Sequence, residues 1–189
     1  HQIMNDVKFY LDSAEKKMSE ATIYLEEALA HIRAGKANVK ILDSVKVDAY
    51  GSKMALSAVA NISVPDARSI MITPWDKSMF RHIEKAIMDS NVGITPENNG
   101  EVIRLNIPPL TEERRKQLVK DSKAESEKAK VSIRNARREA IEGLKKAVKD
   151  GMAEDVQKDA EAKVQKLHDK FLKKVDELFA AKEKEILTV

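Results

Sequence analysis

The sequence predicts an α+β protein of two domains, in which a small α+β domain is inserted between the first and second helices of an antiparallel three-helix bundle. Two observations predict this arrangement. Apolar residues recur at helical spacing along both ends of the chain. Short β-branched runs and three of the five prolines fall between them, in residues 36–107. Because long apolar repeats are stable only when buried, we expect the three long helices to pack together.

The first helix is predicted over residues 3–32. Its apolar residues alternate spacings of four and three, a 3.5-residue repeat typical of coiled-coil packing. The repeat comprises Val7, Leu11, Ala14, Met18, Ala21, Leu25, Ala28 and Ile32. Gly35 supplies a stop signal, and we expect Arg33 in the last turn, where a cation suits the helix dipole.

The middle of the chain is predicted to form the small domain. Residues 45–50 alternate apolar and polar side chains, and Gly51 follows as a turn. Further strands are expected over 56–64, 69–73 and 101–107. An amphipathic helix is expected over 76–90, with Asp76 as its N-cap. The only tryptophan, Trp75, is expected to pack inside this domain.

The last part of the chain is predicted to form two more helices, over residues 111–149 and 153–186. Thr111 and the acidic residues after it begin the first of these, and Gly151 permits the reversal. Gly143 weakens the prediction of one continuous helix, since an interior glycine costs about 1 kcal/mol relative to alanine. The predicted bundle domain is residues 1–34 with 108–189, and the inserted domain is 35–107. Its connectors form a predicted hinge at Ala34, Gly35, Ile107, Pro108 and Pro109.

Positive charge is concentrated on the second bundle helix. Residues 111–149 contain 13 Lys or Arg against 7 Asp or Glu, while the whole 189-residue chain has a net charge of +3. Six of these cations fall in an arc roughly 100° wide on the helical projection. We call them the basic stripe: Lys116, Lys120, Lys123, Lys130, Arg134 and Arg137. A solvated helix face is the simplest interpretation of such a charge run, but it does not explain why acidic residues are scarce along it.

No pattern in the chain predicts covalent chemistry. There is no cysteine, and phosphate-loop, dinucleotide and nucleophile-elbow motifs are absent from the sequence. The histidines lack metal-ligand spacing. We therefore expect no catalytic residue, no metal and no cofactor. No apolar run reaches a membrane span and no signal peptide is visible, so we expect a cytoplasmic protein. Aromatic residues are 4% of the chain, which favours phosphate contacts with a folded RNA over base stacking.

Several segments resemble the ribosome recycling factor family. They are the run of residues 86–120 that ends in PPLTEERRKQLVK, the segment VSIRNARREA at 131–140, IRAGKA at 32–37 and WDKSM at 75–79. The resemblance covers essentially the whole chain in order. It implies an elongated, L-shaped molecule with a small α/β-sandwich domain, whose outline approximates that of a tRNA.

The resemblance also implies a function. Family members bind the post-termination ribosome at the rRNA of the large subunit (23S rRNA). Together with elongation factor G, which hydrolyses GTP, they split the subunits and free mRNA and tRNA. The family's arginine-rich element matches Arg134, Arg137 and Arg138, of which we expect Arg137 to matter most. Arg33 and Lys36 match its basic turn, although the family usually has arginine where this chain has Lys36, which makes a bidentate phosphate contact there doubtful.

Arg115 matches a third family element, but by angle it lies nearer the packed side of its helix. A structural role near the hinge therefore competes with RNA binding for this residue. Glu127 interrupts the basic stripe and is expected to pair with Lys123 or Lys130. The candidate RNA-binding set is thus Arg33, Lys36, Arg115, Lys116, Lys120, Lys123, Lys130, Arg134, Arg137 and Arg138.

Two other functions stay open at this point. The chain could be a structural coiled-coil adaptor, which uses its repeats to bind partner helices, or a general RNA-binding helical protein. The adaptor hypothesis predicts oligomers that depend on concentration, whereas the translation-factor hypothesis predicts a monomer.

Overall fold

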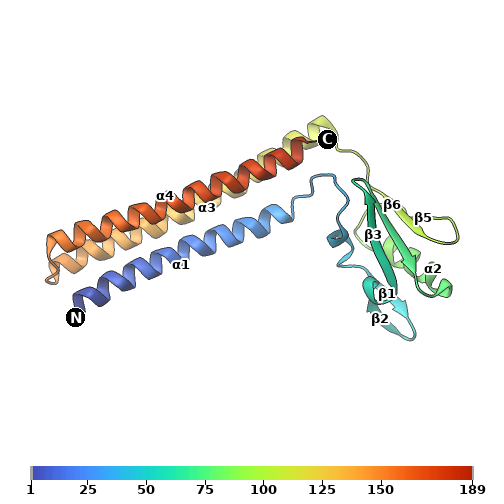
Figure 1. Cartoon of the computed structure of the whole chain (residues 1–189), viewed down its shortest axis with the longest axis horizontal. Helices are drawn as coiled ribbons and strands as arrows, with labels where there is room; N and C mark the ends of the chain where they lie inside the picture. The colour runs from blue at the N-terminus through green and yellow to red at the C-terminus, as the bar shows by residue number, and fades with distance from the viewer. Residues whose placement is uncertain (1, 189) are drawn as a thin grey trace. The chain divides into compact units, whose positions relative to one another are not determined.

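The structure, a computed structural model, describes residues 2–188, with side chains described from Asp6 onward. The chain forms two compact units (Figure 1). One contains the residues up to Ala34 and those from Glu112 onward, and the other is Gly35–Thr111. The first is a helical bundle and the second a small antiparallel sheet domain, so the predicted fold class is confirmed.

The bundle consists of three long helices, α1 (Gln2–Ala30), α3 (Glu112–Lys149) and α4 (Glu154–Leu187). Each of them contacts the other two. The apolar repeats predicted on all three pack into one core. Its fully buried members include Met18, Leu25, Ile133, Leu144 and Val164. The 38 residues of α3 make a rod of about 57 Å at 1.5 Å per residue.

Helix α3 continues through Gly143, and a side chain of α1 occupies the space beside this glycine. The Tyr10 ring of α1 lies where a side chain at Gly143 would project, with Cζ 2.6 Å from the position of an added Cβ. The glycine thus allows α1 and α3 to approach closely, which offsets its low helix propensity.

The reversal between α3 and α4 follows the prediction for Gly151. This residue has a φ of 115°, a conformation that glycine adopts without strain. The Gly151 amide donates to the Val148 carbonyl, and the Met152 amide donates to the Ala147 carbonyl. These two bonds form a Schellman motif, and the buried Met152 side chain closes it.

Helix α1 ends two residues earlier than predicted. Its last residue is Ala30, and the Ile32 amide donates to Leu29 only three residues back. His31 Nδ1 also lies 2.7 Å from the Glu27 carbonyl oxygen, so a side chain competes for one of the last helical acceptors. The expectation that Arg33 occupies the last turn is therefore wrong, since no basic residue lies in that turn.

The small domain contains a hairpin, a four-stranded sheet and one helix. The hairpin pairs β1 (Lys46–Ala49) with β2 (Ser52–Ala55), and Tyr50 and Gly51 both have positive φ in its turn. The sheet has the antiparallel order β3 (Ala60–Asp66), β4 (Ser69–Pro74), β6 (Ile103–Asn106), β5 (Glu97–Asn98). Helix α2 (Phe80–Asp89) packs on the common core of this domain.

Asp76 begins the segment that leads into α2, as predicted. Its carboxylate accepts hydrogen bonds from the amide and the hydroxyl of Ser78, which caps a 3-10 turn at Lys77–Met79 before α2. The predicted strand 56–64 begins instead with a 3-10 turn at Leu56–Ala58.

Trp75 does not pack inside the small domain, so that expectation is wrong. The side chain of Trp75 is 67% exposed, whereas Pro74 before it is buried. The Trp75 amide donates to the Val59 carbonyl. Strand alternation therefore explains the error, because Pro74 takes the inward position and the next side chain faces the opposite way.

Candidate nucleic-acid interface

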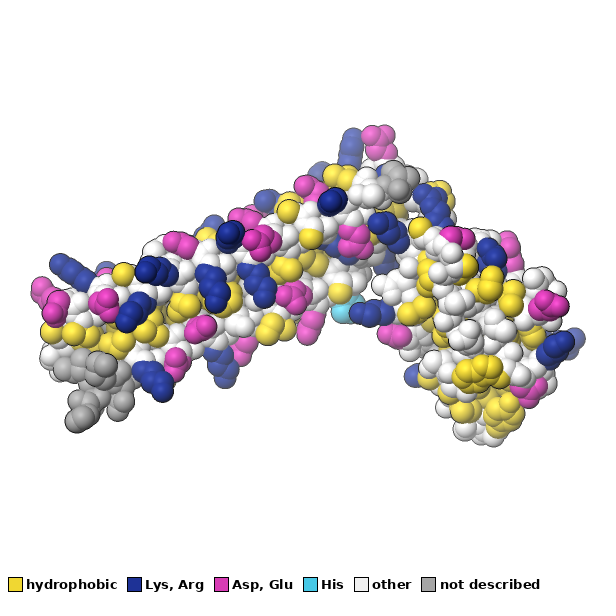
Figure 2. All heavy atoms as spheres, in the orientation of Figure 1, with side chains coloured by type: hydrophobic (Ala, Val, Ile, Leu, Met, Phe, Trp, Pro, Cys, Tyr) yellow, Lys and Arg dark blue, Asp and Glu magenta, His cyan; other side chains and the backbone are white. Residues whose placement is uncertain are grey.

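The basic stripe lies on α3, on the side away from the buried residues Ala129, Ile133 and Ala136. Lys116, Lys120, Lys123 and Arg134 are exposed, as the angular analysis predicts. On the bundle face shown in Figure 2, Lys or Arg and Asp or Glu side chains are interspersed. The stripe differs from that pattern, since Glu127 is the only acidic residue within its arc between Lys116 and Arg137.

Acidic residues of α3 and α4 partly neutralise the two lysines in the middle of the stripe. Lys130 is 17% exposed, and its Nζ lies 2.8 Å from Asp176 of α4 and 4.0 Å from Glu127. The Lys123 ammonium lies 3.6 Å from Glu127 and 5.0 Å from the centre of the Phe179 ring. The predicted pairing of Glu127 with Lys123 and Lys130 is confirmed. These two lysines offer less free charge than their positions on a single helix suggest.

Arg137 is half-buried at the boundary between α3 and α4. Its Nη1 donates to Gln165 Oε1 at 3.2 Å, while its Nε is buried without a hydrogen-bond partner. Gln165 Nε2 in turn donates to Asp169 Oδ1 at 2.9 Å. The guanidinium is therefore held in place by α4, and its other nitrogen, Nη2, is left to donate elsewhere.

Asp169, which accepts the hydrogen bond from Gln165, also contacts a buried histidine. His168 is 6% exposed, and its Nδ1 lies 2.9 Å from Asp169 Oδ1. The hydrogen bond from His168, followed by that from Gln165 and the nearby charge of Arg137, lowers the pKa of Asp169 below its ordinary value. A carboxylate that stays ionised keeps Gln165 oriented toward Arg137. We call Arg137, Gln165, His168 and Asp169 the Arg137 cluster.

Four of the exposed candidate cations on α3 have no ion-pair partner among residues 2–188: Lys116, Lys120, Arg134 and Arg138. Arg134 and Arg138 are exposed and one helical turn apart. With Arg137 they place three guanidinium groups within five residues. Arginine can contact phosphate with two parallel hydrogen bonds, so this group suits an RNA backbone better than the lysines do.

The other candidate residues lie near the ends of the bundle helices. Arg115 is half-buried and its Nε has no partner, in agreement with its angle toward the packed side. Arg33 and Lys36 are exposed beyond the end of α1. Arg33 belongs to the bundle unit, whereas Lys36 belongs to the small domain.

The predicted hinge residues differ in how firmly they are held. The Ile107 amide donates to the Arg68 carbonyl at 2.7 Å, which fixes Ile107 to the small domain. Pro108 and Pro109 are exposed. Gly35 has a φ of 78°, and the side chain of Leu110 lies 2.6 Å from where its Cβ would be. The two connectors therefore touch each other, and only glycine fits at this contact.

Within the described residues, no three His, Asp or Glu side chains come together as a metal-ligand set. No helix in that part of the chain has the length and apolar character that crossing a membrane requires. Fold and surface together define a two-domain protein that presents cations on one face of a helical bundle, a class suited to binding a polyanion.

Comparison with known proteins gives the family. The model of the ribosome recycling factor family matches residues 25–187. The ribosome-recycling factor of Bacteroides thetaiotaomicron is 67% identical over 186 residues, which cover 98% of this chain and all of the relative. A solution structure of a ribosome recycling factor aligns with a TM-score of 0.75 at 38% identity, covering 97% of this chain and 98% of its own.

A second structure describes the Thermus thermophilus ribosome recycling factor and the Escherichia coli elongation factor G bound to the E. coli post-termination complex. It aligns with a TM-score of 0.60 at 42% identity and covers 96% of this chain and 98% of its own. The chain belongs to the ribosome recycling factor family, whose members are translation factors and not enzymes.

The residues of α4 that contact the stripe were not predicted from the sequence. Gln165, Asp169 and Asp176 recur at spacings of four and seven along α4. This spacing places them on one side of the helix. The pattern is visible in the sequence, but the rotation of α4 against α3 is needed to show that it faces the stripe.

Proposed function

We propose that this chain binds the post-termination ribosome in the cytoplasm and splits its subunits, together with elongation factor G and the hydrolysis of GTP by that factor. The splitting releases mRNA and tRNA for reuse. Membership of the ribosome recycling factor family carries this proposal. A solved relative bound to the post-termination complex with elongation factor G supports it.

We further propose that α3 contacts phosphates of the large-subunit rRNA. Arg134, Arg137 and Arg138 are the main contacts, because two of them are exposed and have no ion-pair partner within residues 2–188, and the third is held in place by Gln165. Lys116 and Lys120 extend the contact along the helix. Lys123 and Lys130 contribute less, since Glu127 and Asp176 already compensate them.

We propose that the remaining candidates contribute less to RNA binding. Arg33 and Lys36 would contact RNA as exposed charges at the connector. Arg115 would act mainly by packing, because its Nε is buried. The hinge residues Ala34, Gly35, Ile107, Pro108 and Pro109 would allow the inserted domain to move when the elongation factor acts.

The coiled-coil adaptor is disfavoured by the packing of the bundle. The repeats of α1, α3 and α4 bury one another within a single chain, so they are not available to bind partner helices. A single sedimenting species of one-chain mass at all concentrations is expected, and oligomers that grow with concentration would favour the adaptor.

Substitutions at the two exposed arginines test the RNA-binding surface directly. Arg134→Glu with Arg138→Glu should weaken binding to large ribosomal subunits about tenfold or more, since each lost phosphate contact removes counterion release. Lys146→Glu is the matched control, because Lys146 is equally exposed on α3 but outside the basic stripe. Equal affinities for all three proteins, with unchanged helical circular dichroism, would refute this surface.

A splitting assay tests the function itself. Post-termination ribosomes should separate into subunits only when this protein, elongation factor G and GTP are all present. A GTP analogue that cannot be hydrolysed should prevent the separation. Ribosomes that stay intact with all three components would overturn the proposal.

A further inference from the structure

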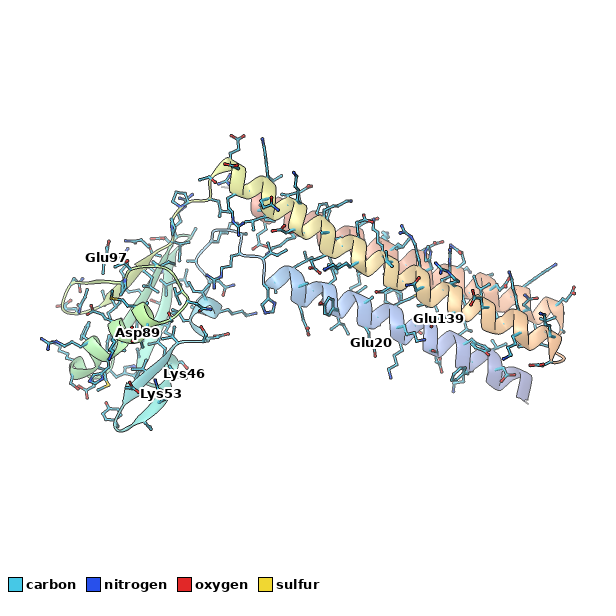
Figure 3. The ribbon with its side chains drawn as sticks, turned by 180° about the vertical axis from the view of Figure 1, so that it is seen from behind. Glu20, Lys46, Lys53, Asp89, Glu97 and Glu139 are labelled. Carbon is cyan, nitrogen blue, oxygen red and sulfur yellow. The ribbon has the colours of Figure 1, made fainter. Side chains whose placement is uncertain are left out.

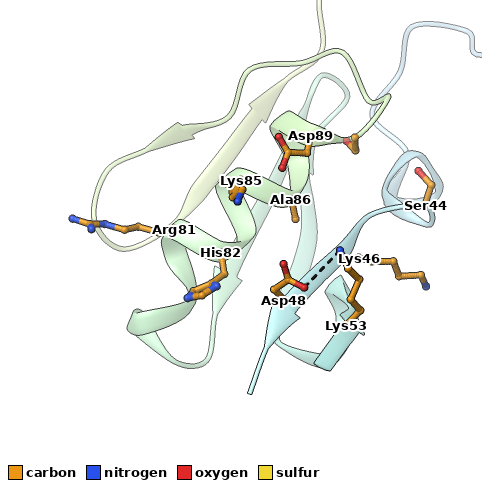
Figure 4. Close-up of a pocket in the computed structure, with 10 residues that line it drawn as sticks. Ser44, Lys46, Asp48, Lys53, Arg81, His82, Lys85, Ala86 and Asp89 are labelled. Atoms are coloured by element: carbon orange, nitrogen blue, oxygen red, sulfur yellow. Dashed lines mark ion pairs between the residues drawn. The ribbon is translucent and has the colours of Figure 1, made fainter. Parts of the chain in front are cut away.

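A groove lined mainly by charged and hydroxyl-bearing residues crosses the small domain between the β1–β2 hairpin and helix α2 (Figure 4). Its volume is about 630 Å³. Its cations come from both sides. Lys46 and Lys53 stand on the hairpin, and Arg81 and Lys85 stand on α2 together with His82.

Strand and helix periodicity place these side chains in the groove. In β1, Val47 and Ala49 face the core while Lys46 and Asp48 face outward. In α2, Phe80, Ile83 and Ile87 are buried, whereas Arg81, His82 and Lys85 are exposed. The groove is therefore the outer surface of two elements that share one core.

The charge of the groove is positive after its internal pairing is counted. Four Lys or Arg side chains line it against two carboxylates, those of Asp48 and Asp89. Asp48 lies 3.6 Å from the Lys53 ammonium. In the described part of the chain, Lys46, Arg81 and Lys85 have no ion-pair partner. Three cations are thus free to bind an external anion.

The lining favours nucleic acid over protein. Ala86 is the only apolar residue among the ten that line the groove. Protein interfaces are centred on aromatic and other apolar side chains and are depleted in lysine, aspartate and serine. Phosphate backbones are bound mainly by lysine, arginine and hydroxyl groups, which is the composition found here.

A second hollow in the same domain provides a contrast. It is lined by Val39, Leu42, Leu56, Ile62 and the exposed Trp75, among others. Its apolar lining is of the kind that protein partners use. The small domain therefore offers two chemically different surfaces, and the groove beside α2 is the one suited to phosphate.

We propose that the groove between the β1–β2 hairpin and α2 is a second RNA-binding site, which holds the sugar-phosphate backbone of ribosomal RNA. This inference rests on the proposed ribosome binding, but it concerns a surface on the inserted domain that is separate from the α3 stripe. Since each domain would then hold RNA, a movement of the inserted domain would break one set of phosphate contacts while the other remains.

The test removes charge without reversing it. Lys46→Gln with Lys85→Gln removes two unpaired cations, and Lys40→Gln with Lys77→Gln is the matched control at exposed lysines outside the groove. Binding of the full-length proteins to vacant ribosomes is measured over a series of salt concentrations. The groove variant should lower the slope of log affinity against log salt by about 1.5, or roughly 0.7–0.9 for each phosphate contact.

Three outcomes overturn the inference. In the first, the groove variant and the control have the same slope. In the second, the groove variant has a lower melting temperature than the control, so that its weaker binding reflects damage to the fold. In the third, the groove variant keeps its salt slope but loses binding to elongation factor G away from the ribosome, which would make the groove a protein contact.

The two RNA surfaces fail in distinguishable ways. When Arg134→Glu and Arg138→Glu are combined with the groove substitutions, independent sites predict that the losses in log affinity add. If the α3 substitutions have no effect while the groove substitutions reduce the slope, the stripe proposal fails and the groove stands. If the groove substitutions have no effect while the α3 substitutions weaken binding, only the groove proposal is refuted.

Discussion

The close approach of α1 and α3 at Gly143 predicts a measurable conflict between helix propensity and packing. Gly143→Ala adds one methyl group that would overlap the Tyr10 ring, with Cζ at 2.6 Å and Cδ1 at 2.8 Å. Real side chains essentially never approach that closely, so the ring or the helix must move. Tyr10 packs against the bundle core and makes an edge-to-face contact with Phe9 at 5.3 Å, which limits where its ring can go.

Two opposing contributions give the expected magnitude. Alanine gains about 1 kcal/mol over glycine inside a helix, whereas forcing an extra methyl into a packed site costs about 1–3 kcal/mol. We therefore expect Gly143→Ala to lower the free energy of unfolding by roughly 0–2 kcal/mol. In a Tyr10→Ala background the overlap disappears, so the same substitution should raise the free energy of unfolding by about 1 kcal/mol.

The assay is urea unfolding of the four proteins of this double-mutant cycle, followed by circular dichroism of the helices. The effect of Gly143→Ala on the free energy of unfolding should change sign between the two backgrounds. This change is more informative than either effect alone, because it separates the contact with Tyr10 from the helix propensity of alanine. If Gly143→Ala stabilises the wild-type protein as much as it stabilises the Tyr10→Ala protein, the steric reasoning is refuted.

Three further predictions concern single side chains. Gln165→Ala should reduce affinity for the large subunit severalfold without changing the melting temperature, because Arg137 loses the acceptor that orients it, while Gln157→Ala should have no effect. Hydrogen bonds from Ser78 and Tyr50 lower the pKa of Asp76 below 3.8. Its contribution to stability is therefore complete above that pH and lost as the pH falls through the lowered pKa. Asp76→Asn keeps a capping oxygen but does not titrate, so it should show a shallower loss of stability in acid than wild type. Trp75 should show the red-shifted, readily quenched fluorescence of an exposed indole, and a blue-shifted, protected signal would contradict its placement.

The sequence predicted the long helices well because their apolar repeats extend over many turns. A regular repeat of apolar residues along α1 is hard to produce by chance, and most of its members pack into the bundle core. The end of α1 was less predictable, since the contact of the His31 side chain with the Glu27 carbonyl is not encoded in the apolar spacing. Short strands were also missed. β2 contains no β-branched residue, and β5 has only two residues, so neither carries a pattern long enough to detect.

The candidate site was predictable only as far as one helix determines it. The angular positions of Lys116, Lys120 and Arg134 follow from α3 alone, and these residues are exposed as expected. The contacts of Lys130 with Asp176 and of Arg137 with Gln165 depend on the register of α4 against α3. That register is set by how the two apolar faces interlock, which spacing along a single helix does not encode.

These inter-helix contacts give the stripe a graded strength that suits a factor which must bind and then leave. At its centre, Lys130 already has Asp176 as a counter-charge, so an arriving phosphate replaces an existing partner and gains little. Near its C-terminal end, Arg134 and the neighbouring Arg138 have no such partner among the described residues, so a phosphate contact there would release counterions outright. Under the proposed RNA binding, affinity would be concentrated in this short group of arginines, while the rest of the stripe would guide the approach electrostatically. If few contacts carry the binding, as proposed, a modest displacement of the bundle would be enough to break them together.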